Sequence, residues 1–541
     1  MRLTSEKQLL LKRLISQARD YFEDTIKVER VRRLRLNPEC TGSMWIGAGN
    51  SVICEMDCHP RCGTATVPPG TAIFNKCRCK DRRCVRSFDQ YEGSVNYADF
   101  VLFVAVNHGI CSDYTLAYAA RCNMHPISKR PISGYVNICP TAFNAMQRNE
   151  MAQWISTIKH ELIHAFVFST SQYQNYVGAK PPIAKKPIPI VPGILEKFTR
   201  TDWELGGGMS SRDVYMIVTP KVRKEARKYF GCDTLEGAEI ESQGSSGTSG
   251  SHWEKRVFEN EAMSGVATQV YAVSRLTLAL FEDSGWYQVD YSKAENMTWG
   301  KGLGCDFVKK SCLTWMKSPY GPYPFCTQEY DMRCNADRKS KVSCNLIRSS
   351  SRVPAEYDYN SPNLFKDENN KPIAAYGQEQ IADYCPYYRV FGEISKEATD
   401  TRCTYSGNMY YNNYSLEIFS RSARCFSLEG GIKVKQKLQK TTYNMKVGCY
   451  ETTCKDNRLH IKMQSSKFYP CYHAGQFIHV EKRVLGVGKV YTKIVCPPCK
   501  EICGKECKPD KIHEEKIGDY EKTSTSIAVL LSILVMLLFF F

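Results

Sequence analysis

The sequence has no internal repeat, which excludes solenoid and propeller architectures made of stacked copies of one unit. Acidic residues are also scarce, because 56 Asp and Glu stand against 73 Lys and Arg and leave a formal net charge of +17. The basic residues are spread along the chain and are not interleaved with aromatic residues as they are in a nucleic-acid groove. We therefore expect no nucleic-acid partner, whereas an acidic or glycan-rich partner surface stays open.

Residues 1–28 and 527–541 differ from a typical signal peptide and from a full-length membrane span. Residues 9–14 contain Lys12 and Arg13 and are too charged for the apolar core of a signal peptide, and residues 5–28 instead have the spacing of an amphipathic helix. The hydrophobic run 527–541 is shorter than the roughly 20 residues of a bilayer span. Because a polar segment precedes it, the run is typical of a lipid-anchor (glycosylphosphatidylinositol) signal, and a tail-anchored membrane helix is the alternative.

Cysteine is abundant. The 26 cysteines are an even number and too many thiols for a reducing compartment, so we expect structural disulfides whose pairing the sequence leaves undetermined. Two clusters of cysteines, within residues 54–62 and 496–507, are candidates for structural zinc sites. Neither has the two separated C-x-x-C knuckles of a zinc ribbon, which favours disulfides in both.

The stretch His160-Glu161-Leu162-Ile163-His164 has the spacing of a zinc site on a helix. Residues four apart share a helical face, so both imidazoles reach one ion, and Glu161 is placed to act on a metal-bound water. The apolar residues of segment 151–166 fall opposite the two histidines, which supports a helix here. The alternative, two histidines on an ordinary amphipathic helix, leaves Glu161 without a role.

A catalytic zinc needs a third protein ligand and an open position for water or substrate. His252 is a candidate because it follows the flexible run 244–251, although composition leaves it one of several among the ten histidines. Met263, shortly after it, is by composition more typical of ordinary core than of a metal site.

Several extended segments carry a family resemblance: Gly250-Ser251-His252-Trp253 and residues 218–227, 234–241, 280–288 and 299–305. In these segments the sequence resembles leishmanolysin-type zinc peptidases, the metzincins that include invadolysin-like proteins, and the likeness extends from about residue 5 to residue 507. The resemblance implies that His160, His164 and His252 hold one Zn²⁺, that Glu161 is the catalytic base, and that Met263 is the Met-turn residue below the metal.

One position departs from the family pattern. The family has glycine three residues after the second histidine, where the helix ends, and this chain has Val167. A β-branched residue is strained at positive φ, so Val167 predicts a longer helix or a shifted turn and puts activity in some doubt.

We expect an α+β fold. Residues 1–170 are expected to form a metzincin-like catalytic subdomain with a mixed sheet and the active-site helix, and residues 171–304 a mostly helical central subdomain with His252 and the Met-turn. A disulfide-rich, mainly β domain (305–510), a polar spacer (511–526) and the hydrophobic tail (527–541) come after them.

Apolar runs predict strands at residues 26–31, 100–106 and 135–139. By resemblance to metzincins, the last of them would be the sheet edge to which an extended peptide adds. Helices are expected at residues 218–230 and 266–281. The proline-rich segment 180–193 predicts a loop.

The function predicted is a zinc-dependent endopeptidase that cleaves proteins or peptides at the cell surface, attached to the membrane, with a role in cell adhesion or migration. Sequons at Asn296 and Asn413 mark candidate glycosylation sites. Because relatives carry a leader and an inhibitory pro-segment, we expect this chain to begin after them. The alternatives are a non-catalytic surface binding protein that keeps the zinc fold, and an intracellular peptidase.

Overall fold

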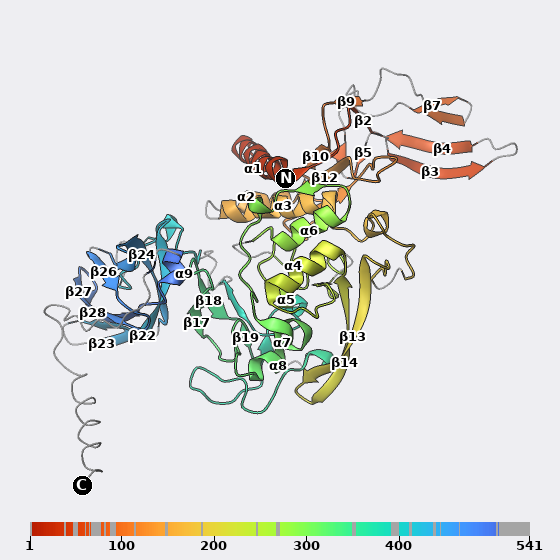
Figure 1. Ribbon diagram of the computed structural model, residues 1–541. Coiled ribbons are helices and arrows are strands. Elements are labelled where there is room, and N and C mark those ends of the chain that lie inside the picture. The colour runs from red at the N-terminus through yellow and green to blue at the C-terminus, as the bar shows by residue number, and fades with distance from the viewer. Residues whose placement is uncertain are drawn as a thin grey trace, which may run out of the picture. The chain divides into compact units, whose positions relative to one another are not determined.

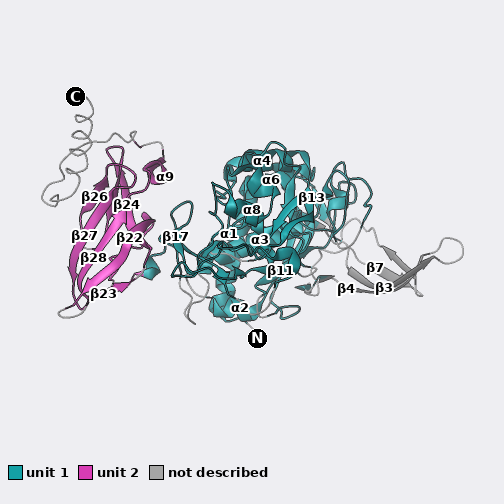
Figure 2. Cartoon of the chain, turned by 90° about the horizontal axis from the view of Figure 1, so that it is seen from below, with its two compact units in different colours: residues 1–408 teal, residues 409–541 magenta. Residues whose placement is uncertain are grey.

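The structure is a computed structural model of the chain (Figure 1). The residues it describes are 3–36, 39–46, 52–59, 61–63, 65–66, 77–80, 83–86, 94–112, 115–146, 150–184, 188–244, 247–266, 271–348, 353–390, 400–409, 414–436, 440–443, 445–464, 466–504 and 507. The chain divides into two compact units, Met1–Asn408 and Met409–Phe541 (Figure 2). The boundaries expected after residues 170 and 304 both fall inside the first unit, and the spacer and tail expected at 511–541 lie outside the described residues.

The first unit contains a mixed three-stranded sheet and two long helices. β10 (Val101–Ala105) runs parallel to β12 (Ser133–Ile138), and β11 (Ala117–Arg121) pairs antiparallel with the other side of β12. α3 (Met151–Phe166) packs on β11 and β12, and α1 (Ser5–Thr25) packs on α3. The mixed helix-and-sheet composition expected here is confirmed.

The order of this sheet corrects one prediction. β12 is the central strand, so the prediction that residues 135–139 form the sheet edge is wrong. Five of the six β12 residues are buried, as expected of a strand flanked on both sides, whereas every residue of β11 is half-buried. The antiparallel edge strand on which α3 packs is therefore β11.

Short strands occupy much of the remaining amino-terminal segment. The strand expected at residues 26–31 is reduced to β1 (Ile26–Lys27), which pairs with β16 (Gln288–Val289), because α1 continues to Thr25. The other elements are β2 (Arg33–Arg35), β3 (Glu39–Ile46), β4 (Val52–His59), β5 (Arg61–Cys62), β6 (Ala65–Thr66), β7 (Cys77–Lys80), β8 (Arg83–Arg86), β9 (Ser94–Asn96) and α2 (Pro140–Ala145).

The central segment is not mostly helical, so that prediction is wrong. A long hairpin, β13 (Leu195–Leu205) and β14 (Gly208–Ile217), pairs with β15 (Ala238–Ile240). Over residues 196–201 of β13, exposed positions alternate with half-buried or buried ones, which is the two-residue period of a strand. Among its described residues, the proline-rich segment before β13 has only isolated bridges, as expected of a loop.

The central segment contains the helices α4, α5 and α6. The helix expected at 218–230 is confirmed as α4 (Pro220–Phe230). The one expected at 266–281 begins later, as α6 (Arg275–Asp283), because the Ser274 hydroxyl accepts hydrogen bonds from the first turn and caps it there; residues 267–270 lie outside the described part. α5 is a single turn (Lys255–Phe258).

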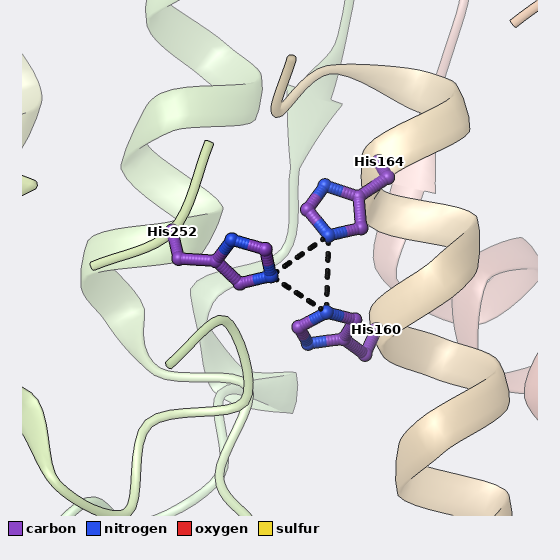
Figure 3. Close-up of side chains that lie close together, drawn as sticks. All are labelled: His160, His164 and His252. Atoms are coloured by element: carbon purple, nitrogen blue, oxygen red, sulfur yellow. Dashed lines mark hydrogen bonds between the residues drawn. The ribbon is translucent and has the colours of Figure 1, made fainter. Parts of the chain in front are cut away.

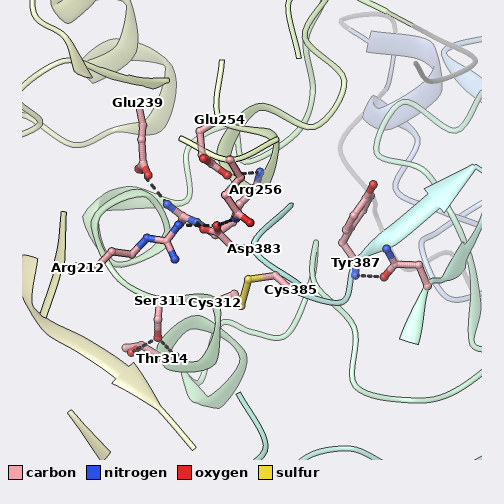
Figure 4. The surroundings of a disulfide bond; sticks show 12 residues. Arg212, Glu239, Glu254, Arg256, Ser311, Cys312, Thr314, Asp383, Cys385 and Tyr387 are labelled. Carbon is pink, nitrogen blue, oxygen red and sulfur yellow. Dashed lines mark hydrogen bonds and ion pairs between the residues drawn. A yellow bond between two sulfur atoms is a disulfide. The ribbon is translucent and has the colours of Figure 1, made fainter. Parts of the chain in front are cut away.

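Residues 305–408 belong with the central segment because covalent and ionic links join them. Cys232 is disulfide-bonded to Cys305, and the buried carboxylate of Asp383, next to the Cys312–Cys385 disulfide, binds Arg256 of α5 (Figure 4). The elements here are α7 (Gly304–Lys309), α8 (Cys312–Lys317), β17 (Met332–Cys334), β18 (Lys341–Cys344), β19 (Leu346–Ile347), β20 (Tyr376–Gly377) and β21 (Tyr388–Val390).

The second unit is mainly β, as expected for the C-terminal region. Its strands have the order β26-β25-β24-β22-β28-β27, with β23 paired to the far half of β22. They are β22 (Ala423–Lys435), β23 (Lys440–Tyr443), β24 (Val447–Lys455), β25 (Arg458–Lys462), β26 (Phe468–Cys471), β27 (Phe477–Val484) and β28 (Gly488–Val495), followed by α9 (Lys500–Cys503).

The cysteines form disulfides, as predicted. Described pairs are Cys62–Cys122, Cys111–Cys139, Cys232–Cys305, Cys312–Cys385, Cys326–Cys344, Cys454–Cys503, Cys471–Cys496 and Cys499–Cys507. In the late cluster every sulfur is thereby engaged, so no thiolate there is free to bind zinc. The side chains of Cys54 and Cys58 lie outside the described part. In the described residues we find no helix with the length and apolarity of a membrane span.

Candidate metal centre

Three imidazoles from two distant parts of the chain meet at one point (Figure 3). His160 and His164 lie one turn apart on α3, and His252 comes from the segment after β15. The Nε2 atoms of His160 and His164 are 3.0 Å apart, and the Nε2 atom of His252 lies 3.1 Å from each. The structure therefore brings together the three histidines that the sequence and the resemblance named as zinc ligands.

The other ring nitrogen of each histidine faces a backbone carbonyl. His160 Nδ1 lies 2.6 Å from the oxygen of Ala262, His164 Nδ1 lies 2.7 Å from that of Phe168, and His252 Nδ1 lies 2.9 Å from that of Thr248. A carbonyl oxygen only accepts, so each Nδ1 carries the proton and each Nε2 of the neutral ring presents a lone pair.

This arrangement is unfavourable without a cation. Burial lowers the pKa of His160 to about 4 and of His252 to about 3, and it lowers the pKa of His164 well below the ordinary value, so all three rings are neutral near pH 7. Three lone pairs then converge with no proton between them. Tetrahedral zinc with Zn–N bonds of 2.0–2.1 Å requires nitrogen separations of about 3.3 Å, and the observed triangle is close to that size. The donor set fits Zn²⁺.

Glu161 lies on the same helix, next to the triad, and is only 6% exposed. Burial raises the pKa of its carboxyl to about 8, a shift that a neighbouring cation opposes. Among the described residues, no hydrogen bond or ion pair holds this carboxylate. Within the described part of the chain this carboxylate is therefore not held in place by a polar partner.

Comparison with known proteins agrees with this geometry. The family model described as leishmanolysin matches residues 79–509. A leishmanolysin-like peptidase of Caenorhabditis briggsae is 34% identical over 94% of this chain and 82% of its own length. One from Drosophila melanogaster is 32% identical over 99% and 86%, and a leishmanolysin of Leishmania donovani is 28% identical over 93% and 71%.

The chain belongs to the leishmanolysin family of peptidases. Membership makes it a metalloendopeptidase of a family that is generally zinc-dependent. The resemblance inferred from the sequence segments is confirmed.

Val167, which stands in place of the family's glycine, does not adopt a positive φ. α3 ends at Phe166, and Val167 turns the chain with φ −149° and ψ −44°, so its backbone is not in the left-handed region that favours glycine. Of the two alternatives predicted for Val167, the longer helix is wrong, and the shifted turn stays a prediction. The same turn places the carbonyl of Phe168 against His164, so Val167 is compatible with an oriented ligand.

The segment around Met263 contains a residue that sequence reasoning passed over. Met263 is fully buried, and the carboxylate of Glu261 accepts a hydrogen bond of 2.5 Å from its backbone nitrogen. Glu261, also fully buried, further accepts bonds from Ser274 and Thr277 at the start of α6. In the sequence, the only indication of this role of Glu261 was an acidic residue shortly before Met263, which is a weak one. The backbone carbonyls that face the histidine rings cannot be identified from sequence, because every residue has a carbonyl.

Of the two candidate glycosylation sites, one is among the described residues. Asn296 is exposed, as a glycan acceptor must be, and Asn413 lies outside the described residues.

Proposed function

We propose that this chain is a zinc-dependent endopeptidase whose metal is held by His160, His164 and His252. The observation that carries the proposal is the convergence of three unprotonated Nε2 atoms within 3.1 Å beside a buried glutamate. When bound at such a site, zinc lowers the pKa of a coordinated water towards about 7 and polarises the scissile carbonyl.

Glu161 supplies the acid–base chemistry. Its carboxylate accepts a proton from the attacking water and then donates it to the leaving amine. Burial favours the protonated form of this carboxyl, and that form is the one that donates a proton to the leaving amine. Because no partner among the described residues holds the carboxyl, its side chain can move from the attacking water to the leaving nitrogen.

The proposal also includes a binding place for the substrate. We assign substrate binding to β11, because it is the antiparallel edge strand of the sheet that packs on α3. An extended peptide that adds to this edge is held by main-chain hydrogen bonds, which are independent of side-chain sequence. Protein and peptide substrates in general are therefore expected.

Replacement of Glu161 by Gln tests the assignment. The Glu161→Gln variant should retain one zinc per chain and lose peptide hydrolysis by at least about a hundredfold, since the amide cannot accept the proton. Glu368→Gln, the same change at an exposed position, is the matched control and should keep parental kcat/KM. A Glu161→Gln enzyme that cleaves casein at the parental rate would refute the role of Glu161.

We further propose that the protein acts at the cell surface, attached through its hydrophobic end. The support is the tail sequence 527–541 together with the disulfides, which form in oxidising compartments. Treatment of intact cells with a phosphatidylinositol-specific phospholipase C should release the protein if the anchor is lipid. Retention after treatment, with extraction by detergent only, would favour a membrane helix.

The alternative of a non-catalytic binding protein drew in part on Val167. Because Val167 adopts a negative φ and the three Nε2 atoms still converge, Val167 no longer favours that alternative, and we retain the peptidase.

A further inference from the structure

A four-stranded part of the second unit presents one face to solvent. β27, β28, the far half of β22, and β23 lie side by side in that order (Figure 2). Their inward residues are apolar and buried: Ile432, Val434, Ile478, Val480, Val490 and Ile494. The alternate residues therefore all point outward on the same face.

Basic side chains dominate this outward face. We name the set of exposed basic residues on it the basic face: Lys433, Lys435, Lys440, Arg483, Lys489 and Lys493.

Four of these residues form a single row across the strands. Arg483 lies opposite Lys489, Lys489 opposite Lys435, and Lys435 opposite Lys440. Residues directly opposite each other in antiparallel strands have their side chains on the same side, so the row brings four like charges together. With strands about 4.8 Å apart, the row spans about 14 Å.

The positive charge of the face is poorly compensated. Two acidic residues share it, Glu429 opposite Lys493 and Glu481 opposite Tyr491, and Glu481 forms an ion pair with Lys489. In the described part of the chain, no carboxylate pairs with Lys435, Lys440 or Arg483. Like charges opposite each other destabilise a sheet, so an anionic ligand that crosses the row would relieve the repulsion.

The neighbouring aromatic residues and the disulfides indicate which class of anionic ligand fits this face. Phe477, 43% exposed, lies beneath Lys493, and Tyr491 lies beneath Lys489, so each offers a flat apolar surface beside a cation. Such surfaces suit the faces of sugar rings. Disulfides such as Cys471–Cys496 in the same unit form in oxidising compartments, where sulfated polysaccharides occur.

We propose that the basic face binds a sulfated polysaccharide of the glycosaminoglycan type, which lies across β27, β28, β22 and β23 with its sulfates on the row of four cations. This activity is separate from peptide hydrolysis, because it uses no residue of the metal centre. It would hold the peptidase on a glycan-rich surface and concentrate it near substrates located there.

Charge removal in the full chain tests the proposal. The triple variant Lys435→Gln, Lys440→Gln, Arg483→Gln should bind heparin at least about tenfold more weakly near 0.15 M salt, and its affinity should fall less steeply with salt, because fewer counterions are released. Lys12→Gln, Arg13→Gln, Lys301→Gln removes the same charge from exposed positions of the first unit and is the matched control. Both variants should keep parental peptide hydrolysis, and the first should not lose thermal stability.

The ligand panel separates the classes of partner. Heparin and chemically desulfated heparin are compared with vesicles that contain phosphatidylserine. Binding of heparin that requires sulfate and the intact row supports the proposal. Equal weakening by the control variant, equal binding of desulfated heparin, or preferential binding of the vesicles through the same residues would overturn it.

Discussion

The hydroxyl of Thr277 donates a 2.5 Å hydrogen bond to the carboxylate of Glu261 and accepts one of 2.9 Å from the indole of Trp253. Trp253 directly follows His252, and Glu261 directly precedes Ala262, whose carbonyl orients His160. One buried carboxylate is thus connected to the surroundings of ligands from both parts of the chain.

Replacement of Glu261 by Gln should weaken zinc binding. The amide brings an N–H₂ group to a position surrounded by donors, namely Met263 N, Ser274 N and Oγ, and Thr277 Oγ1, so the turn beneath the metal must shift. We expect zinc affinity to fall about 10- to 100-fold, as is usual when a group that supports a ligand is changed. Competition with a chromophoric chelator measures the dissociation constant directly.

Ser274→Ala is the milder companion to that change. It removes one of the four donors and should lower zinc affinity less than Glu261→Gln does. The absorption spectrum of the cobalt-substituted protein reports ligand geometry without reference to activity. A Glu261→Gln protein with parental zinc affinity and an unchanged cobalt spectrum would show that Glu261 serves the fold alone.

Restoring the family's glycine at Val167 should harm this protein. Val167 is fully buried with φ −149°, so glycine removes packed methyl groups and gains nothing from its freedom at positive φ. We expect a loss of about 2–3 kcal/mol of stability, with about half of it already lost in Val167→Ala. Thermal unfolding and kcat/KM provide the readouts. A glycine variant that is more active and equally stable would reverse our view of this turn.

The buried ion cluster shown in Figure 4 should be sensitive to loss of its central carboxylate. Asp383 is fully buried and binds Arg212 at 2.5 Å and Arg256 at 3.0 Å. Its φ of 57° favours Asp or Asn, so Asp383→Asn removes the charge while keeping a residue suited to the backbone. Because Arg212 loses its carboxylate partner and Arg256 keeps only Glu239, we expect a destabilisation of about 3–5 kcal/mol. Asp383→Ala should be worse still, and an Asn variant that melts with the parent would contradict this role of the carboxylate.

The pair between Arg200 and Glu236 should make stability depend on pH. Burial raises the pKa of Glu236, but the hydrogen bonds from Arg200, at 2.8 and 2.9 Å, act together with a backbone hydrogen bond, the charge of Arg200 and a hydrogen bond from Lys309, and their sum lowers the pKa to about 2. A depressed folded-state pKa stabilises the protein above the unfolded value of about 4.5, and this contribution is lost as the pH falls from there towards 2. Glu236→Gln should therefore cost about 2 kcal/mol at pH 7 and progressively less below pH 4.5. Thermal unfolding of the parent and the variant at pH 7, 4 and 3 measures this difference in stability. A difference in stability that stays constant or grows as the pH falls would contradict the role of the Arg200–Glu236 pair.

Local patterns allowed several elements to be predicted without coordinates. The helix of residues 151–166 follows from the spacing of its apolar residues, and that spacing by itself puts His160 and His164 on one face. The strand at residues 101–105 follows from its continuous apolar run. The disulfide-forming character of the cysteines follows from their number. Resemblance, not periodicity, selected His252.

Other features depend on which segments meet in space. Residue 252 approaches α3 only because its segment packs through Trp253 and the Glu261 turn, and no local pattern encodes contacts between residues about ninety positions apart. The sheet order that makes β11 the edge, the place of residues 305–408 within the first unit, and the row of cations across four strands were likewise decided by tertiary pairing. The sequence alone determined which chemical groups are present and which helical face carries two of them. Only the folded chain decided that three lone pairs converge, because convergence is a property of long-range packing and not of spacing.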